Sequence, residues 1–198
     1  RDRQFELQAV DPATGGFVEG VVNVGDSTQK GIEFDFSWRL ADRFTFSGGA
    51  GYIDAKWKDG VISPVSGLDL SGVQPPNVSK WSASAALEYE GDIGGGEFFV
   101  RAQGRYKGAS TTNAQFFDTP GDDYPIFKNP SYLVADISTG VEFGPFKAGL
   151  ALENLFDKRY FNDVQEFPNF AGTQGEPGNI VIGTLGQVRR FMALVSFQ

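Results

Sequence analysis

The sequence predicts an all-β fold, an antiparallel up-and-down transmembrane β-barrel of about eight strands. Three observations support this fold class. Apolar and polar residues alternate along nearly the whole chain, which is the period of a strand with two different faces. Short turns and long polar connections alternate strictly between these strands. Aromatic residues gather at both ends of the apolar face, as they do where a barrel meets the two surfaces of a bilayer.

The composition agrees with many strands joined by turns and excludes several functions. The 198 residues include 26 Gly and 19 Phe, and no run approaches the roughly 18 to 20 apolar residues of a membrane helix. Because the chain has no His and no Cys, it lacks the residues for a disulfide, a thiol nucleophile or a His-based triad. We therefore expect no enzyme and no cofactor, and no metal site built from His or Cys. The net charge of −8 argues against a nucleic-acid partner. The first residues alternate like a strand and not like a signal peptide, which indicates a processed chain or an internal fragment.

Each expected strand is defined by apolar residues at every second position. These residues are Phe5, Leu7 and Ala9; Ile32, Phe34, Phe36, Trp38 and Leu40; Phe44, Phe46, Gly48, Ala50 and Tyr52; Trp81, Ala83, Ala85, Leu87 and Tyr89; and Phe98, Val100, Ala102, Gly104 and Tyr106. Three more strands are expected at about 132–143, 146–156 and 187–198. Several of them approach the roughly 9 to 11 residues that a strand needs to span a bilayer.

The connections between these strands are of two kinds. Short turns are expected at 41–42, 91–96 and 144–145. Long polar connections are expected at about 59–78, 109–130 and 157–186, with a shorter one at 11–18. An up-and-down meander has this order when the connections at one end are short turns and those at the other end are long loops. Outer-membrane barrels have short periplasmic turns and longer extracellular loops.

The distribution of side chains on the apolar face indicates that this face meets lipid. Aromatic residues lie beside the short turns (Trp38, Phe44, Tyr89, Phe98, Phe143, Phe146 and Phe197) and toward the long connections (Tyr52, Trp81, Tyr106, Phe156 and Phe191). Between these rows the face carries mostly small or aliphatic residues, such as Ala85, Leu150 and Val195. Two aromatic rows around an aliphatic band are typical of a membrane barrel.

The opposite face carries charged residues deep within the strands. They are Glu88, Arg101, Arg105, Lys107, Asp136, Glu142, Lys147 and Glu153. In a membrane barrel they line the lumen, whereas in a soluble β-barrel or sandwich binding module they form an ordinary solvated surface. The membrane interpretation is favoured because a closed barrel satisfies every backbone donor and acceptor in hydrocarbon.

Several stretches resemble a known family. The segment E-N-L-F-D-K-R-Y-F begins at Glu153, a Gly-rich stretch follows, and the last strand reads G-Q-V-R-R-F-M-A-L-V-S-F-Q. Together they resemble the C-terminal end of TonB-dependent outer-membrane receptors, and G-I-E-F-D-F-S-W-R-L and P-P-N-V-S-K-W are similar to earlier strands of that family. The motif residues are Asn154, Leu155, Phe156, Asp157 and Tyr160. Two departures are Val188, where the family often has Pro, and the terminal Gln198 after Phe197.

The resemblance implies more than the periodicity can show. Residues 1–198 would be the C-terminal part of a 22-stranded barrel, about its last third, with the plug domain and the TonB-binding segment absent from this chain. The implied location is the outer membrane of a Gram-negative bacterium. The implied function is TonB-coupled uptake of a scarce nutrient such as a ferric siderophore. The implied partners are the lipid bilayer, TonB through the missing N-terminal region, and the barrel-insertion machinery through the C-terminal strand. A complete small eight-stranded barrel with a structural or adhesive role is the alternative within the membrane class.

The long connections supply the candidate ligand-binding residues, which are the aromatic residues Phe116, Phe117, Tyr124, Phe127, Phe167 and Phe170. Exposed rings are costly unless they pack together or stack on a ligand, so mutual packing is the competing interpretation. The acidic residues Asp118, Asp122 and Asp123 are a weaker candidate for a calcium site. The motif itself is expected to be the outer end of the strand 146–156, continuing past the bilayer without a turn.

Overall fold

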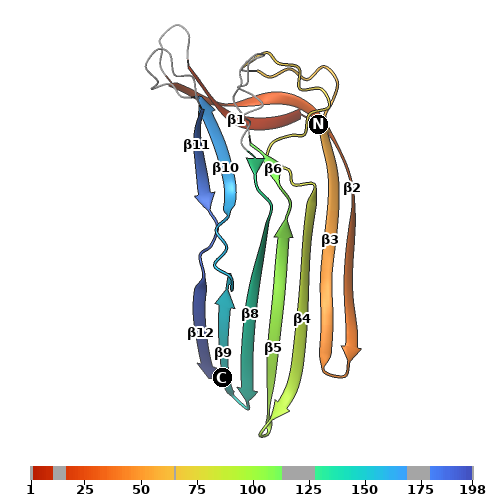
Figure 1. Ribbon diagram of the computed structural model, residues 1–198, viewed down its shortest axis with the longest axis vertical. Coiled ribbons are helices and arrows are strands. Elements are labelled where there is room, and N and C mark those ends of the chain that lie inside the picture. Colours follow the sequence, from red (N-terminus) through yellow and green to blue (C-terminus); the bar gives the residue numbers. More distant parts are fainter. Residues whose placement is uncertain (1, 11–16, 65, 113–127, 169–178, 198) are drawn as a thin grey trace.

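The computed structural model describes residues 2–10, 17–64, 66–112, 128–168 and 179–197. Eight of its strands form one sheet, in the order β1-β2-β3-β4-β5-β8-β9-β12, and every neighbouring pair is antiparallel (Figure 1). These strands are β1 (Asp2–Val10), β2 (Phe17–Ala41), β3 (Phe44–Trp57), β4 (Trp81–Ile93), β5 (Gly96–Lys107), β8 (Tyr132–Phe143), β9 (Phe146–Glu153) and β12 (Arg190–Phe197). The all-β, eight-stranded meander is therefore confirmed.

The sheet is an open, single-layered wall. Within the described residues, β1 and β12 stand at its two edges and each pairs with one neighbour in the sheet. It is therefore neither a closed eight-stranded barrel nor one half of a sandwich, since no second sheet covers it in the part of the chain that the structure describes (Figure 1). Within that same part, no helix has the length and hydropathy that a membrane-spanning helix requires.

The short turns lie together at one end of the sheet, which we call the turn end. They connect β2 to β3, β4 to β5 and β8 to β9, as the sequence predicts. Gly94, Gly95 and Gly144 adopt positive φ values of 55°, 87° and 54° in two of these turns. Only glycine adopts this conformation readily, so these residues let the strands reverse direction tightly.

The long connections lie at the opposite, external end and contain strands that the sequence analysis missed. The expected connection 157–186 contains an antiparallel hairpin of β10 (Phe161–Pro168) and β11 (Asn179–Leu185), and 109–130 contains the short β6 (Ser110–Thr111) and β7 (Lys128–Asn129). The sequence analysis predicted polar connections here. It missed these strands because their runs of β-forming residues are shorter and alternate less clearly than those of the wall.

The second strand is also much longer than expected. Its 25 residues, at about 3.3 Å each, far exceed the roughly 25 Å apolar band of a membrane barrel. Its outer half and β1 bend across the external end of the sheet (Figure 1). In this outer half, Gly25 has a φ of 140° and lies opposite Arg3, where the β1–β2 register shifts between Arg3 and Gln4.

The register places most of the large apolar residues of the wall on one face, the apolar face. Phe44 lies opposite Tyr89, which lies opposite Val100, and Phe143 lies opposite Phe146, which lies opposite Phe197. The aromatic rows are continuous across neighbouring strands, with ring centroids 4.7 Å apart for Phe44–Tyr89 at the turn end and 4.7 Å apart for Tyr52–Trp81 toward the external end. The predicted rows are therefore confirmed as neighbours in space.

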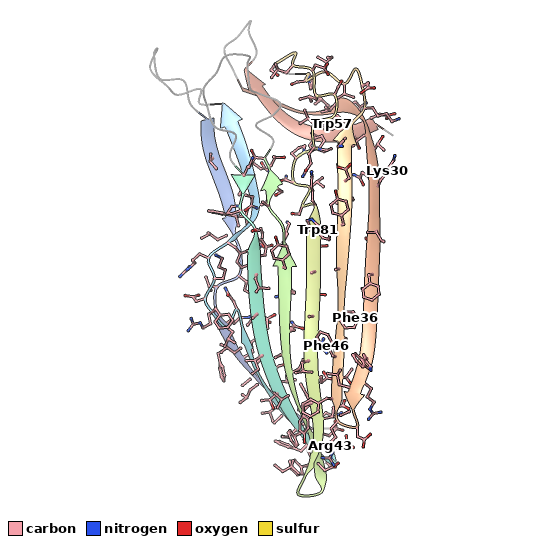
Figure 2. All side chains as sticks on the ribbon, turned by 45° about the vertical axis from the view of Figure 1, so that its right-hand side comes forward. Lys30, Phe36, Arg43, Phe46, Trp57 and Trp81 are labelled. Carbon is pink, nitrogen blue, oxygen red and sulfur yellow. The ribbon has the colours of Figure 1, made fainter. Side chains whose placement is uncertain are left out.

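The middle of the apolar face is not purely aliphatic. On β2 and β3 the rings of Phe36 and Phe46 lie 5.0 Å apart, well below Trp57 and Trp81 in Figure 2. A Cβ atom at Gly48 would lie 3.2 Å from the Phe36 ring, so this ring covers the space that the glycine leaves. Aromatic residues commonly fill the gap beside a strand glycine in this way.

The apolar face is exposed, although its side chains are large. Ile32 is 71% exposed, Trp38 64% and Leu150 47%. An uncovered apolar surface that extends over seven strands is not stable in water. It fits the hydrocarbon of a bilayer, which agrees with the aromatic rows on both sides.

The buried hydrophobic cluster lies at the external end of the sheet and not in the wall. Val24, Trp57, Val61 and Leu70 are nearly inaccessible, and Phe5 packs on Trp57 with ring centroids 5.8 Å apart (Trp57 is labelled in Figure 2). Val61 and Leu70 come from the connection 58–80, which also contributes a hydrogen bond from the Leu70 N–H to the Val61 carbonyl (2.8 Å). This connection is therefore a packed cap on the bent part of β2.

An ion pair closes the base of this cap and makes it sensitive to acid. Lys58 Nζ donates to Asp26 Oδ2 at 2.7 Å, and this hydrogen bond lowers the pKa of Asp26 below its ordinary value of 3.8. Because the pKa of Asp26 is lower in the folded state, the contact stabilises the cap fully at pH values above the unfolded-state pKa. This stabilisation disappears as the pH falls through the folded-state pKa and the carboxylate is protonated. We expect amide hydrogen exchange at Val61 and Leu70, corrected for intrinsic rates, to accelerate below about pH 4. Asp26→Asn should weaken this pH dependence without abolishing it, because hydrogen bonds from Ser71 also lower the pKa of Asp69 in the cap. A wild-type exchange rate that is flat from about pH 6 to pH 3 would contradict the assignment.

Candidate functional site

Most of the aromatic ligand candidates lie outside the described residues. This applies to Phe116, Phe117, Tyr124, Phe127 and Phe170, and also to the acidic residues Asp118, Asp122 and Asp123. Phe167 lies on β10, where its backbone is opposite Ile180 of β11. These residues remain predictions. Among the described residues, no group of three or more acidic side chains is arranged to hold a metal ion.

The family motif forms a turn that ends β9. The strand stops at Glu153, Asn154 and Asp157 adopt positive φ values of 51° and 49°, and the Asp157 N–H donates to the Asn154 carbonyl at 2.8 Å. The expectation of a strand that continues to 156 without a turn is therefore wrong. Asn and Asp tolerate the left-handed conformation better than other residues with a side chain, which explains a turn without Gly or Pro.

Asn154 is the centre of this turn and is almost completely buried, with 1% of its surface exposed. Its side-chain Oδ1 accepts from the Lys158 N–H at 2.8 Å, and its Nδ2 donates to the carbonyls of Lys158 (3.0 Å) and Gln187 (2.8 Å). Its backbone N–H donates to Asp136 Oδ1 at 2.8 Å. The Asn154 side chain therefore connects the end of β9 to the segments before β10 and before β12. The Asn154 backbone N–H connects the same turn to β8.

The other motif residues extend this connection. The Leu155 N–H donates to the Ala135 carbonyl of β8 at 2.7 Å, and Asp157 Oδ1 accepts from the Arg189 N–H at 3.3 Å. Phe156 is 74% exposed, next to the outer aromatic row. The Tyr160 ring packs on Tyr132 with centroids 4.3 Å apart. The motif thus attaches the external hairpin to the wall.

The charged side chains of the wall share the face opposite the apolar one, which we call the charged face. Pairs on adjacent strands are Arg101–Glu88 (3.1 Å), Arg105–Asp136 (3.0 Å), Lys147–Glu142 (3.0 Å) and Arg190–Glu153 (2.9 Å). Each exposed pair contributes little stability, about 0 to 1 kcal/mol. Their common orientation, however, makes this the water-facing side of the wall, as predicted.

The pair formed by Arg105 and Asp136 differs from the others in its burial. The Asp136 side chain is 9% exposed, whereas that of Arg105 is 59% exposed. Asp136 also accepts hydrogen bonds from Gln103 Nε2 at 2.9 Å and from the Asn154 N–H. The carboxylate is thus enclosed in the wall by three donors while the guanidinium extends from the charged face. The sequence suggested a charged lumen residue at each position but not this asymmetry.

Comparison with protein families identifies this architecture. Residues 1–155 match the model of the TonB dependent receptor-like, beta-barrel family. No curated protein matches the chain in a sequence comparison.

Solved structures share the fold at low sequence identity. The siderophore receptor PiuA from Acinetobacter baumannii matches with a TM-score of 0.64 at 22% identity, over 98% of this chain and 25% of that one. The ferric yersiniabactin uptake receptor FyuA from Yersinia pestis matches with a TM-score of 0.64 at 18% identity, over 90% of this chain and 24% of that one. BauA, the ferric preacinetobactin receptor from Acinetobacter baumannii, matches with a TM-score of 0.62 at 17% identity, over 98% and 26%.

The chain spans about a quarter of the length of these structures. An exposed apolar face, a charged face and short turns at one end are the properties of a sheet that closes around a lumen in a membrane. The chain belongs to the TonB dependent receptor-like β-barrel family, whose members are transport receptors of the Gram-negative outer membrane and not enzymes.

Proposed function

We propose that this chain forms the last eight strands of a 22-stranded receptor barrel that takes up a ferric siderophore across the outer membrane, driven by TonB. In this proposal the plug and the TonB-binding segment belong to a part of the receptor outside this chain. The structural relatives PiuA, FyuA and BauA are named for siderophore or ferric-siderophore reception, which supports the ligand class. The observation that carries the proposal is the two-faced wall, which can separate hydrocarbon from a polar lumen.

The external end of the wall supports a role in ligand capture. The β10–β11 hairpin, the 58–80 cap and the bent β1–β2 ribbon all lie at the external end of the sheet (Figure 1). In this proposal they contact the ligand together with the predicted aromatic residues of 113–127 and 169–178. The edge strand β12, which ends with Phe197, is proposed to be the segment that the barrel-insertion machinery binds.

Uptake of radioactive iron tests the proposed function. Cells that lack their own siderophores and carry the full receptor gene are expected to accumulate ⁵⁵Fe supplied as a ferric siderophore. Deletion of the gene, or collapse of the inner-membrane proton gradient, should reduce this uptake to the background level. Equal uptake with and without the gene, for hydroxamate, catecholate and carboxylate chelates alike, would refute the proposal.

A further inference from the structure

We infer that Arg105 is the anion-binding residue of a ligand subsite on the charged face, and that the subsite takes an iron chelate with free carboxylates. This inference rests on the proposed function and names the ligand class. Arg105 is next to Tyr106 of the outer aromatic row, so it lies where the lumen opens to the outside. A ligand that enters from outside meets this level of the wall before it meets the deeper pairs.

Asp136 orients Arg105 but does not occupy all of its hydrogen-bond donors. A guanidinium has five N–H donors in a rigid plane and binds carboxylates through two parallel hydrogen bonds. Among the described residues, Arg105 donates to Asp136 alone, through Nη2 at 3.0 Å. Because Asp136 is buried and has two other donors, its negative charge is largely enclosed, while the 59%-exposed side chain of Arg105 keeps donors free for a ligand.

A groove on the charged face extends from Arg105 across three strands. It has a volume of about 370 Å³ and is lined by Gly49 and Gly51 of β3, Ser82 and Ser84 of β4, and Arg105 of β5. A Cβ atom at Gly49 would meet the Asp35 carboxylate, so the Asp35 side chain lies over this glycine at the floor of the groove. Its volume lies within the range of small-molecule sites, about 300 to 1,000 Å³.

The two ends of the groove have opposite charge. Glu33 and Asp35 of β2 line the end away from Arg105. Three strand spacings separate β2 from β5, a distance of roughly 14 Å. This arrangement fits a chelate that places a carboxylate on Arg105, accepts hydrogen bonds from the hydroxyls of Ser82 and Ser84, and keeps its negative charge away from Glu33 and Asp35.

Binding of two iron chelates to the purified full receptor tests the inference. The probes are ferric citrate, which has free carboxylates, and ferrioxamine B, a hydroxamate chelate without one. Arg105→Gln is expected to weaken ferric citrate binding at least about tenfold, the loss of one charge-assisted hydrogen-bonding partner. Arg105→Lys should restore part of the affinity, because an ammonium keeps the charge but not the planar donor pair.

Arg43→Gln is the matched control, since it removes the same charge from an exposed residue at the turn end, away from the groove and from the external end. It should leave the affinity unchanged, and heat-modifiable migration in gels should verify that all variants contain a folded barrel. The inference is overturned if Arg105→Gln binds ferric citrate as tightly as the wild type, or if the wild type binds only ferrioxamine B. In both cases iron uptake by the receptor would still stand, whereas a receptor that transports no chelate of any class would refute the proposed function itself.

Discussion

Replacing Leu150 by arginine is expected to destabilise the folded receptor in a bilayer by about 2 to 4 kcal/mol, the cost of a cation at mid-membrane on the lipid face of a barrel. Leu150 is 47% exposed and lies between Thr139 and Ala193 on the apolar face, between the two aromatic rows. The free energy of unfolding in urea, measured for the full receptor in lipid vesicles, checks this prediction.

The control is the same substitution one residue further along the strand. Ala151 lies between Ser138 and Met192 on the charged face, with Glu153 two residues away on the same side. Ala151→Arg therefore adds its charge to the lumen and should cost less than about 1 kcal/mol, because surface charges in water contribute little. Similar costs for the two variants would mean that the apolar and charged faces have been assigned to the wrong solvents.

Asn154→Ala is expected to destabilise the receptor by about 2 to 3 kcal/mol, because it removes the three hydrogen bonds that the buried Asn154 side chain makes with the backbone of Lys158 and Gln187. Alanine would also have to adopt the positive φ of 51°, which is strained for a residue with a β-carbon. Unfolding in urea would give the total cost, and amide hydrogen exchange would show that protection is lost first in the β10–β11 hairpin.

Two further variants separate the contributions at this position. Glycine adopts the positive φ without strain but makes no side-chain hydrogen bonds. Asn154→Gly should therefore be more stable than Asn154→Ala only by the free energy of the backbone strain. Asn154→Asp keeps the acceptor for the Lys158 N–H, loses both amide donors and adds a charge near Asp136, so it should be at least as unstable as the alanine variant. An alanine variant with wild-type stability and hairpin protection would show that the turn does not depend on this side chain.

The turn at Asn154 connects the lumen to the external hairpin through a short series of hydrogen bonds. Arg105 donates to Asp136, Asp136 accepts from the Asn154 N–H, and the Asn154 amide donates to the Gln187 carbonyl. The residue that we assign to the anion subsite is therefore held by the same buried carboxylate that holds the base of the hairpin. Changes at Asp136 are expected to affect both, which is why the binding experiment alters Arg105 and not its partner.

Several features of the structure could not have been predicted from the sequence. Asn154 contacts Asp136, 18 residues earlier, and Gln187, 33 residues later, so its role depends on pairing that periodicity does not encode. The Trp57 cluster was missed for a similar reason. Trp57 has the strand position of a charged-face residue, and it meets Val24 because the outer half of β2 bends across the external end of the sheet (Figure 1) and its register with β1 shifts there.

The sequence by itself determined the eight strands of the wall and their two faces, because a period of two assigns every side chain of an extended strand to one face or the other. The aromatic rows indicated the solvent of each face. The sequence also determined which rim has the short turns, and its motifs indicated the family. Only the tertiary structure decided where β9 ends, that β10 and β11 form a hairpin, and that Arg105 extends outward from a buried Asp136. These features arise from contacts between residues far apart in the chain, whose positions are set by strand register and packing and not by the local pattern of apolar and polar residues.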